Sequence, residues 1–285
     1  MQITSGKITG VEKIKMRKVM LFVGLVGCVF LSYGDTLIER IGRNHKIRAT
    51  DVWYGFSRTL FDFEGYEAWI VEPKVGTAEG HPWTWTMQWA SAFVPRTGVL
   101  QLLAKGWHHV TIMTFEKRMD ETGLAVSERF QRFLVEELGF SSTANLIGMS
   151  WGGFFATRYA ARYPKNVSKI YLDCPFLNLG GCCRQLDIGP WATNVSGCWI
   201  DDKRMPINLV RELADAKIPI LLVYGGADNV LDPRLNSEIF IPRFKAAGGN
   251  LKVIYRESYG HHPHGFEESD MTIADFFGGK KIDFK

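Results

Sequence analysis

The sequence predicts an α/β fold with a mostly parallel central sheet, helices on both faces and a small irregular insertion. Apolar runs of strand length alternate with segments of helical periodicity through most of the chain. The run at 218–224 is continuously apolar, as expected of a parallel strand that is buried on both faces. With 285 residues, 46% of them hydrophobic and 22% charged, the chain can bury a large core.

The expected elements follow one another with clear stop signals. The helix at 124–138 has apolar residues at helical spacing and ends at Gly139, and the helix at 153–163 ends at Pro164. Residues 174–205 interrupt the alternation, and we expect them to form a lid over the site. The full set comprises strands at 65–71, 109–114, 144–149, 167–172, 218–224 and 251–255, and helices at 124–138, 153–163, 235–247 and 266–277.

The N-terminal residues 1–34 have the pattern of a signal peptide. A cluster of positive charges precedes the apolar run 19–31, and the small residues Ser32 and Gly34 follow it. Cleavage after Gly34 would leave one domain at 35–285 and export it to the periplasm or the extracellular space. One alternative is a lipoprotein anchored at Cys28, the only case in which a membrane partner is expected. The other is an uncleaved anchor helix.

Cysteines and charge limit the classes of partner. In an exported chain, Cys182 or Cys183 could form a disulfide with Cys198. These cysteines form no C-x-x-C pair and have no histidine nearby, so we expect no zinc site among them. The net charge is +4 and no Lys/Arg-rich run lies in the body of the chain, so nucleic acid is not an expected partner.

The pentapeptide Gly148-Met149-Ser150-Trp151-Gly152 carries the strongest chemical signal. It is a G-x-S-x-G motif with a strand predicted before it and a helix after it. A serine at such a turn exposes its Oγ as a nucleophile, and the glycines let neighbouring backbone approach. The start of the helix offers free N–H groups to a developing oxyanion, and Trp151 would provide one of them.

An acid and a base follow at two later strand ends, where catalytic groups of parallel sheets gather. Asp228 follows the strand at 218–224 and is the predicted acid, while Asp232 before Pro233 is the alternative that simply opens a turn. His261 directly follows Gly260 and is the predicted base, with His262 and His264 as alternatives. The extra histidines could instead give the loop its polarity, contact substrate or bind a metal ion, although no metal site is expected.

The Trp-rich loop at 79–85 is the expected source of the second oxyanion donor. Pro82 has no N–H, which leaves Trp83 or Thr84. The competing interpretation is that the tryptophans of this region pack in the core. Several aromatic side chains are also expected near the site, where they would stack on sugar rings: Trp83, Trp85, Trp151, Trp191, Trp199 and Tyr259.

Ser150, Asp228 and His261 stand in the order found in α/β-hydrolases, and with the motifs around them they resemble that superfamily over about residues 45–280. The H-P-W-T-W and G-H-H-P-H-G segments are similar to exported bacterial hydrolases, some of them carbohydrate esterases. The resemblance implies an α/β-hydrolase fold and a serine esterase that needs no cofactor and cleaves a small-molecule or saccharide ester. Alternatives are a serine peptidase or lipase of this fold, or a non-catalytic binding protein.

Overall fold

The computed structural model describes residues 35–183, 185, 187–193 and 199–280. The chain divides into a unit Met1–Asp35 and a unit Thr36–Lys285. The predicted signal peptide, its cleavage after Gly34 and the alternative anchor at Cys28 all lie outside the described residues. In the described part of the chain, no helix combines the length and hydrophobicity needed to cross a membrane.

A nine-stranded sheet organises the second unit, in the order β1-β2-β3-β5-β4-β6-β7-β8-β9. The first three strands and β5 pair antiparallel, and every pair from β5 through β4 to β9 is parallel. The mostly parallel sheet confirms the predicted fold class. The strands are β1 (Ile47–Trp53), β2 (Phe56–Phe63), β3 (Tyr66–Val71), β4 (Trp83–Thr86), β5 (His108–Ile112), β6 (Ala144–Met149), β7 (Val167–Asp173), β8 (Ile220–Gly225) and β9 (Leu251–Arg256).

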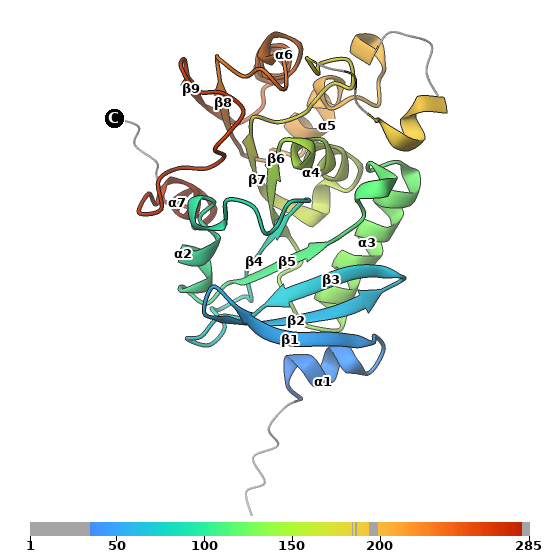
Figure 1. Ribbon diagram of the computed structural model, residues 1–285, viewed down its shortest axis with the longest axis vertical. Coiled ribbons are helices and arrows are strands. Elements are labelled where there is room, and N and C mark those ends of the chain that lie inside the picture. Colours follow the sequence, from blue (N-terminus) through green and yellow to red (C-terminus); the bar gives the residue numbers. More distant parts are fainter. Residues whose placement is uncertain (1–34, 184, 186, 194–198, 281–285) are drawn as a thin grey trace, which may run out of the picture. The chain divides into compact units, whose positions relative to one another are not determined.

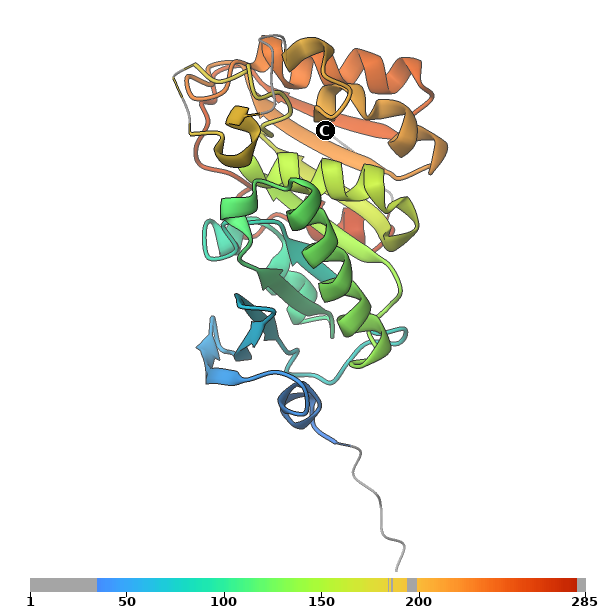
Figure 2. The same cartoon turned by 90° about the vertical axis from the view of Figure 1, so that its right-hand side faces the viewer.

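Helices cover both faces of this sheet (Figure 1). The α-helices are α1 (Leu37–Gly42), α2 (Val99–Leu103), α3 (Glu121–Glu136), α4 (Trp151–Arg162), α5 (Val210–Asp215), α6 (Ser237–Ala246) and α7 (Thr272–Phe277). Short 3₁₀ helices lie at Val94–Arg96, Phe115–Lys117, Pro164–Asn166, Gly189–Thr193, Trp199–Asp201, Pro206–Asn208 and Pro233–Leu235. In Figure 2 the green α3 and the yellow-green α4 run beside each other on one face.

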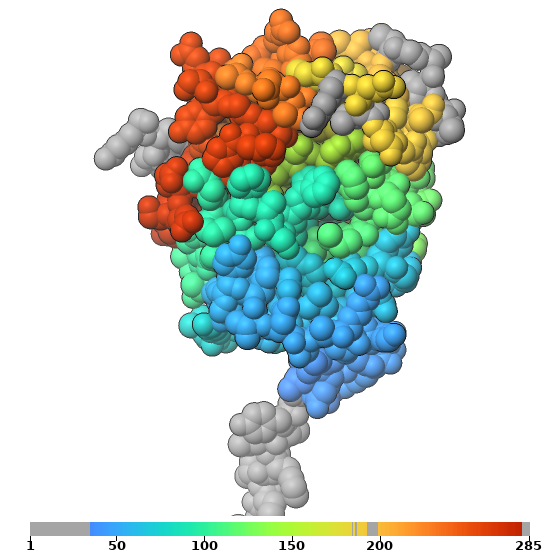
Figure 3. Space-filling model, in the orientation of Figure 1, coloured from blue at the N-terminus to red at the C-terminus, as the bar shows by residue number. Residues whose placement is uncertain are grey.

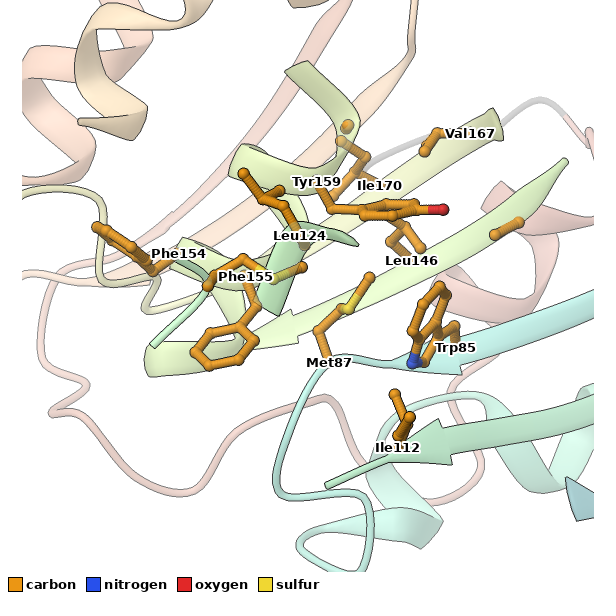
Figure 4. Packing of buried hydrophobic residues seen from close by; sticks show 14 of the residues in the cluster. Trp85, Met87, Ile112, Leu124, Leu146, Phe154, Phe155, Tyr159, Val167 and Ile170 are labelled. Carbon is orange, nitrogen blue, oxygen red and sulfur yellow. The ribbon is translucent and has the colours of Figure 1, made fainter. Parts of the chain in front are cut away.

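Two hydrophobic cores form, one on each face of the sheet. Strand residues alternate between them: Leu146 packs in the core under α3 to α6, and Ile147 packs in the core under α2 and α7. Figure 4 shows Trp85, Leu146 and Tyr159 within the first core. Because both faces of β4 and β6 are covered, every residue of these two strands is buried.

The carboxyl ends of the parallel strands are brought together with loops that come from distant parts of the chain. The backbone N–H of Phe266 donates to the carbonyl of Arg96 at 2.9 Å, and Gln101 Nε2 donates to the carbonyl of Glu268 at 2.7 Å. In Figure 3 the red segment after β9 accordingly lies against the green segment around α2. These bonds hold the loop that carries His261, His262 and His264 beside α2.

The described residues of the insertion predicted at 174–205 pack against the core. Trp191 is buried against Phe154 of α4, and its Nε1 donates to the carbonyl of Arg118 at 2.9 Å. Its described residues thus extend the core over α4. None of those residues lines the pocket beside Ser150, so the lid function has no support from this part of the chain.

Candidate active site

Ser150 lies at the sharp turn between β6 and α4. Its backbone has φ 51° and ψ −121°, a combination that L-residues rarely adopt. A Cβ at Gly148 would come within 2.8 Å of the Gly152 carbonyl oxygen, and one at Gly152 within 2.2 Å of the Met87 carbonyl oxygen. The two glycines of the motif are therefore needed because only a residue without a side chain fits.

Ser150, His261 and Asp228 form a continuous hydrogen-bonded chain. His261 Nε2 is 3.0 Å from Ser150 Oγ, and His261 Nδ1 is 2.7 Å from Asp228 Oδ2. The side chains of His261 and Asp228 are almost fully buried. The carboxylate can only accept, so His261 Nδ1 carries a proton and Nε2 is free to accept the serine hydroxyl proton. The structure thus brings together the three residues that were predicted as nucleophile, base and acid.

The surroundings of Asp228 favour its ionised form. Burial raises the pKa of this carboxyl, but the hydrogen bonds from His261 and from the N–H groups of Leu231 and Val230 outweigh it, and the net pKa is lowered. Both N–H groups donate to Asp228 Oδ1 at 2.9 Å, which also fixes the carboxylate in place. Asp232, the alternative acid, instead accepts from the N–H of Arg234 at the start of a 3₁₀ helix.

The other two histidines of the loop have different partners. His262 is exposed and stacks on Phe93 with 5.5 Å between ring centres. Burial is the largest cause that lowers the pKa of His262, and its histidine neighbours lower it further. His264 is buried, and its Nδ1 lies 3.0 Å from Oδ1 of Asp173. Neither ring takes the place of His261 beside Ser150.

Asp173 is a site residue that the sequence analysis missed. It is the last residue of β7 and pairs in the sheet with Met149, directly before Ser150. Its carboxylate accepts from His264, from the N–H of Gly265 at 2.7 Å and from the hydroxyl of Tyr171. Burial raises the pKa of Asp173, but these donors outweigh it and the net pKa is lowered. Its position at the carboxyl end of a predicted parallel strand was the available signal.

The structure places Trp83 away from the site. It begins β4, at the end of the strand opposite Ser150, and is fully buried with its Nε1 donating to the carbonyl of Ser141 at 2.8 Å. The expectation that Trp83 or Thr84 would be an oxyanion donor is wrong, because the carboxyl end of β4 is Thr86. Residues 87–89 follow it, and the Met87 carbonyl packs against Gly152. This segment, rather than 79–85, lies next to the nucleophile.

Trp151 is at the predicted place. It is the first residue of α4, where helix geometry leaves its N–H without a partner inside the helix. Its side chain is buried and packs edge-on against Phe176 with ring centres 4.6 Å apart. The backbone of Trp151 is therefore available to an oxygen atom bonded near Ser150, while the indole closes the wall of the pocket.

A pocket of about 320 Å³ opens beside Ser150. Apolar side chains dominate its wall, and the polar groups gather at Ser150 and the histidines. Of the aromatic residues expected near the site, only Trp151 lines this pocket; Trp83, Trp85 and Trp191 are in the core. The lining residues are Trp89, Ala92, Phe93, Met149, Ser150, Trp151, Val230, Leu231, His261, His262 and His264.

The described cysteines are free thiols: Cys174, Cys182 and Cys183. The predicted disulfide partner Cys198 lies outside the described residues. Cys174 follows β7 close to the site, but burial, together with the charges of Asp173 and Asp228, raises the pKa of its thiol far above the ordinary value. Cys174 therefore stays protonated and is a poor nucleophile.

Comparisons with known proteins agree with this fold. A family model described as alpha/beta hydrolase fold matches residues 115–185, which include the turn at Ser150. No curated protein sequence matches the chain. Among solved structures, the S-formylglutathione hydrolase from Agrobacterium tumefaciens is similar with a TM-score of 0.56 at 17% identity, over 76% of this chain and 92% of that one.

Two peptidases are similar over a part of their length. The acylaminoacyl peptidase of Pyrococcus horikoshii has a TM-score of 0.53 at 14% identity, over 80% of this chain and 40% of that one. Dipeptidyl peptidase 4 of Porphyromonas gingivalis also has a TM-score of 0.53 at 14% identity, over 72% of this chain and 32% of that one. The family match at residues 115–185, the sheet order and the similar solved structures show that this chain has the α/β-hydrolase fold.

Proposed function

We propose that the protein is a serine hydrolase that cleaves carboxylic esters through an acyl-enzyme. The observation that carries the proposal is the unbroken hydrogen-bonded chain from Ser150 Oγ through His261 to Asp228. His261 Nε2 would take the serine proton as Oγ attacks the acyl carbon, and would return it to the leaving alcohol. Water, activated by the same nitrogen, would then release the acid.

Two backbone segments are suited to hold the oxyanion of the tetrahedral intermediate. One is the N–H of Trp151 at the start of α4, and the other is the backbone of residues 88–89 after β4, since the N–H of Met87 already donates to the carbonyl of Ile147. Such preorganised donors stabilise charge that develops only in the transition state. Asp228 would orient His261 and stabilise the imidazolium that forms when the proton is transferred.

The lining of the pocket supports a substrate with a small apolar group. Trp89, Phe93, Trp151 and Leu231 surround the space next to Ser150, and burial of an apolar acyl or alcohol group there would be favourable. The H-P-W-T-W and G-H-H-P-H-G segments support a saccharide-bearing ester as the substrate. Such a substrate would place its acyl group in the apolar pocket and its sugar outside the pocket.

Hydrolysis of p-nitrophenyl esters of graded acyl length by wild type and Ser150→Ala tests the proposal. We expect activity to decrease with longer chains and the variant to lose at least about 10³-fold in kcat. A fluorophosphonate probe should label wild type at Ser150, as read by peptide mass spectrometry, and should leave the variant unlabelled. Equal rates for both proteins would refute the role of Ser150, provided that circular dichroism shows the same fold.

A substrate panel distinguishes the remaining classes. Acetate or methanol release from acetylated and methyl-esterified polysaccharides would establish the saccharide ester proposal. Faster cleavage of peptide p-nitroanilides than of esters would favour the peptidase alternative. Failure with every substrate and with the probe would favour a binding protein.

We also propose export, for which the support is the charge and hydropathy pattern of residues 13–34. Fractionation of expressing cells tests it. Mature protein that begins at Asp35 in the soluble exported fraction is the expected result. Recovery from membranes with lipid on Cys28 would favour the lipoprotein instead, and full-length protein in the cytoplasm would contradict both.

A further inference from the structure

Three histidine rings form a compact triangle at the mouth of the pocket. The ring centres of His261, His262 and His264 are 4.7, 4.9 and 5.0 Å apart, and each pair of rings is close to perpendicular. One ligand atom from each ring lies within 4.8 Å of the other two. In a tetrahedral zinc site with zinc–nitrogen bonds of about 2.1 Å, three imidazole centres lie about 5 Å apart. The spacing of the ring centres is therefore close to that of three zinc ligands, and the ligand atoms, which lie within 4.8 Å of one another, would have to approach to about 3.4 Å around a bound ion.

In two of the rings a carboxylate holds Nδ1, which leaves Nε2 unprotonated; in His261 this Nε2 accepts from Ser150 Oγ at 3.0 Å and would have to leave the serine to bind a metal. His261 Nδ1 is held by Asp228 at 2.7 Å, and His264 Nδ1 is held by Asp173 at 3.0 Å. A carboxylate that accepts from one ring nitrogen fixes the tautomer and raises the basicity of the other, which is how proteins support metal-bound histidine. In both rings the lone pair is thus on Nε2.

The third ring can adjust its position. His262 is exposed, and its side chain makes no hydrogen bond within the part of the chain that the structure describes. Rotation of this side chain can therefore shorten the distance to the other two nitrogens, and it gives up only the stacking of His262 on Phe93. Ser150 Oγ and water are available as a fourth ligand, since the pocket opens between the serine and the three histidines.

We propose that His261, His262 and His264 bind a zinc ion, and that this ion reversibly inhibits the enzyme by withdrawing His261 from Ser150. Nε2 of His261 cannot accept the serine proton and ligate a metal with the same lone pair. Zinc binding would therefore remove the general base and leave the fold unchanged. The inhibitory part of this inference rests on the proposed function, whereas zinc binding itself does not.

Calorimetric titration of chelator-treated protein with Zn²⁺ alone tests the site. We expect wild type and Ser150→Ala each to bind one ion, and His262→Ala to bind it at least about tenfold more weakly, in the range for loss of metal-site contacts. The matched control is His81→Asn, because His81 is exposed, lies outside the pocket and has φ 49°, which asparagine tolerates. It should bind zinc like wild type.

Ester hydrolysis provides the second measurement, with each variant compared with its own rate in EDTA. Zinc should inhibit wild type at the concentration at which it binds, EDTA should restore the rate, and the midpoint should rise at least about tenfold in His262→Ala. Equal zinc affinity in wild type and His262→Ala, or no binding by wild type and Ser150→Ala, would overturn the inference. Zinc binding without any ester hydrolysis would refute the proposed function alone, and hydrolysis in EDTA without zinc binding would refute this inference alone.

Discussion

Nδ1 of His264 lies 3.0 Å from Oδ1 of Asp173, and this pair stands directly beside the pair formed by His261 and Asp228. The rings of the two histidines meet edge to face with 5.0 Å between their centres. Two buried carboxylates from the ends of neighbouring strands thus hold two histidines of one loop. We infer that Asp173 and His264 anchor the loop, while Asp228 and His261 act on Ser150.

Substitution of Asp173 should therefore affect stability. In Asp173→Asn, three buried donors from Tyr171, Gly265 and His264 face an amide. Only the oxygen of that amide can accept a hydrogen bond, because its NH₂ group is itself a donor. We expect a loss of about 3–5 kcal/mol in the free energy of unfolding, measured with urea. The control is Asp232→Asn, since Asp232 pairs with the exposed side chain of Arg234 and should cost no more than about 1 kcal/mol. Similar losses for both variants would contradict the anchoring role.

Substitution of Asp228 should instead affect the chemistry. In Asp228→Asn the amide oxygen can still accept from the N–H groups of Val230 and Leu231, so the loop can keep its shape. The amide NH₂, however, would face His261 Nδ1 and favour the tautomer whose Nε2 carries the proton. We expect kcat for an aryl ester to decrease on the order of 10⁴-fold, as for this change in other serine hydrolases. Full activity in Asp228→Asn, with loss in Asp173→Asn, would exchange the two assignments.

Gly152 tests the segment proposed to complete the oxyanion site. A methyl group in Gly152→Ala would lie 2.2 Å from the Met87 carbonyl oxygen and must displace residues 87–89. We expect kcat to decrease about 10²–10³-fold, the usual effect of losing an oxyanion donor, with a smaller change in KM. Gly42→Ala is the control, because its Cβ would make only an ordinary contact of 3.9 Å with Ile47. Unchanged kcat in Gly152→Ala would refute the role of the segment.

Substitution of Trp83 should affect the stability of the fold, whereas substitution of Trp89 should affect the binding of substrate. Trp83 is fully buried in the core, so Trp83→Phe should lower the free energy of unfolding by about 1–3 kcal/mol and leave kcat/KM within a few-fold. Trp89 lines the pocket and is 41% exposed, so Trp89→Phe should mainly raise KM. A decrease of kcat by hundreds-fold in Trp83→Phe would instead show that the buried indole of Trp83 affects the reaction.

The sequence predicted the parallel half of the sheet because its strands are apolar runs bounded by clear turn signals. The strand predicted at 144–149 matches β6 at both ends, and 167–172 differs from β7 by one residue. β1 was not predicted, since its residues are mostly exposed and show no alternation. The sequence predicts a loop at 79–85, where the structure has β4, because this strand has only four residues and follows Pro82.

The predictions for the site that were wrong or left open depend on how the strands are arranged in space, which the sequence pattern does not show. The sequence favours Trp83 because it stands in a Trp-rich segment, but only the register of β4 between β5 and β6 shows which end of that segment faces Ser150. His261, His262 and His264 are nearly equivalent in sequence. In the structure, Asp228 binds His261 and Asp173 binds His264, and these contacts distinguish the three rings. Asp173 ends a strand that is followed by no recognisable motif, so the sequence does not point to it.

The pH dependence of stability should reflect two buried histidines that lie outside the site. Burial, the largest cause in both cases, lowers the pKa of His108 to about 4 and that of His109 to about 3, from an ordinary 6.5. Each has a buried ring nitrogen without a hydrogen-bond partner, Nδ1 in His108 and Nε2 in His109. Both side chains are therefore neutral in the folded protein throughout the weakly acidic range.

The unfolded chain binds protons at these histidines below pH 6.5, whereas the folded protein does so only near their lowered pKa values. Stability is therefore fully present above pH 6.5 and is lost as the pH decreases toward 4, by about 1.4 kcal/mol per pH unit for each histidine. Urea unfolding at a series of pH values measures this slope. His109→Leu should make it shallower, while Ile70→Val, a core substitution that removes no titratable group, should lower stability by a similar amount at every pH. The same slope in wild type and His109→Leu would show that His109 is not neutral in the folded state.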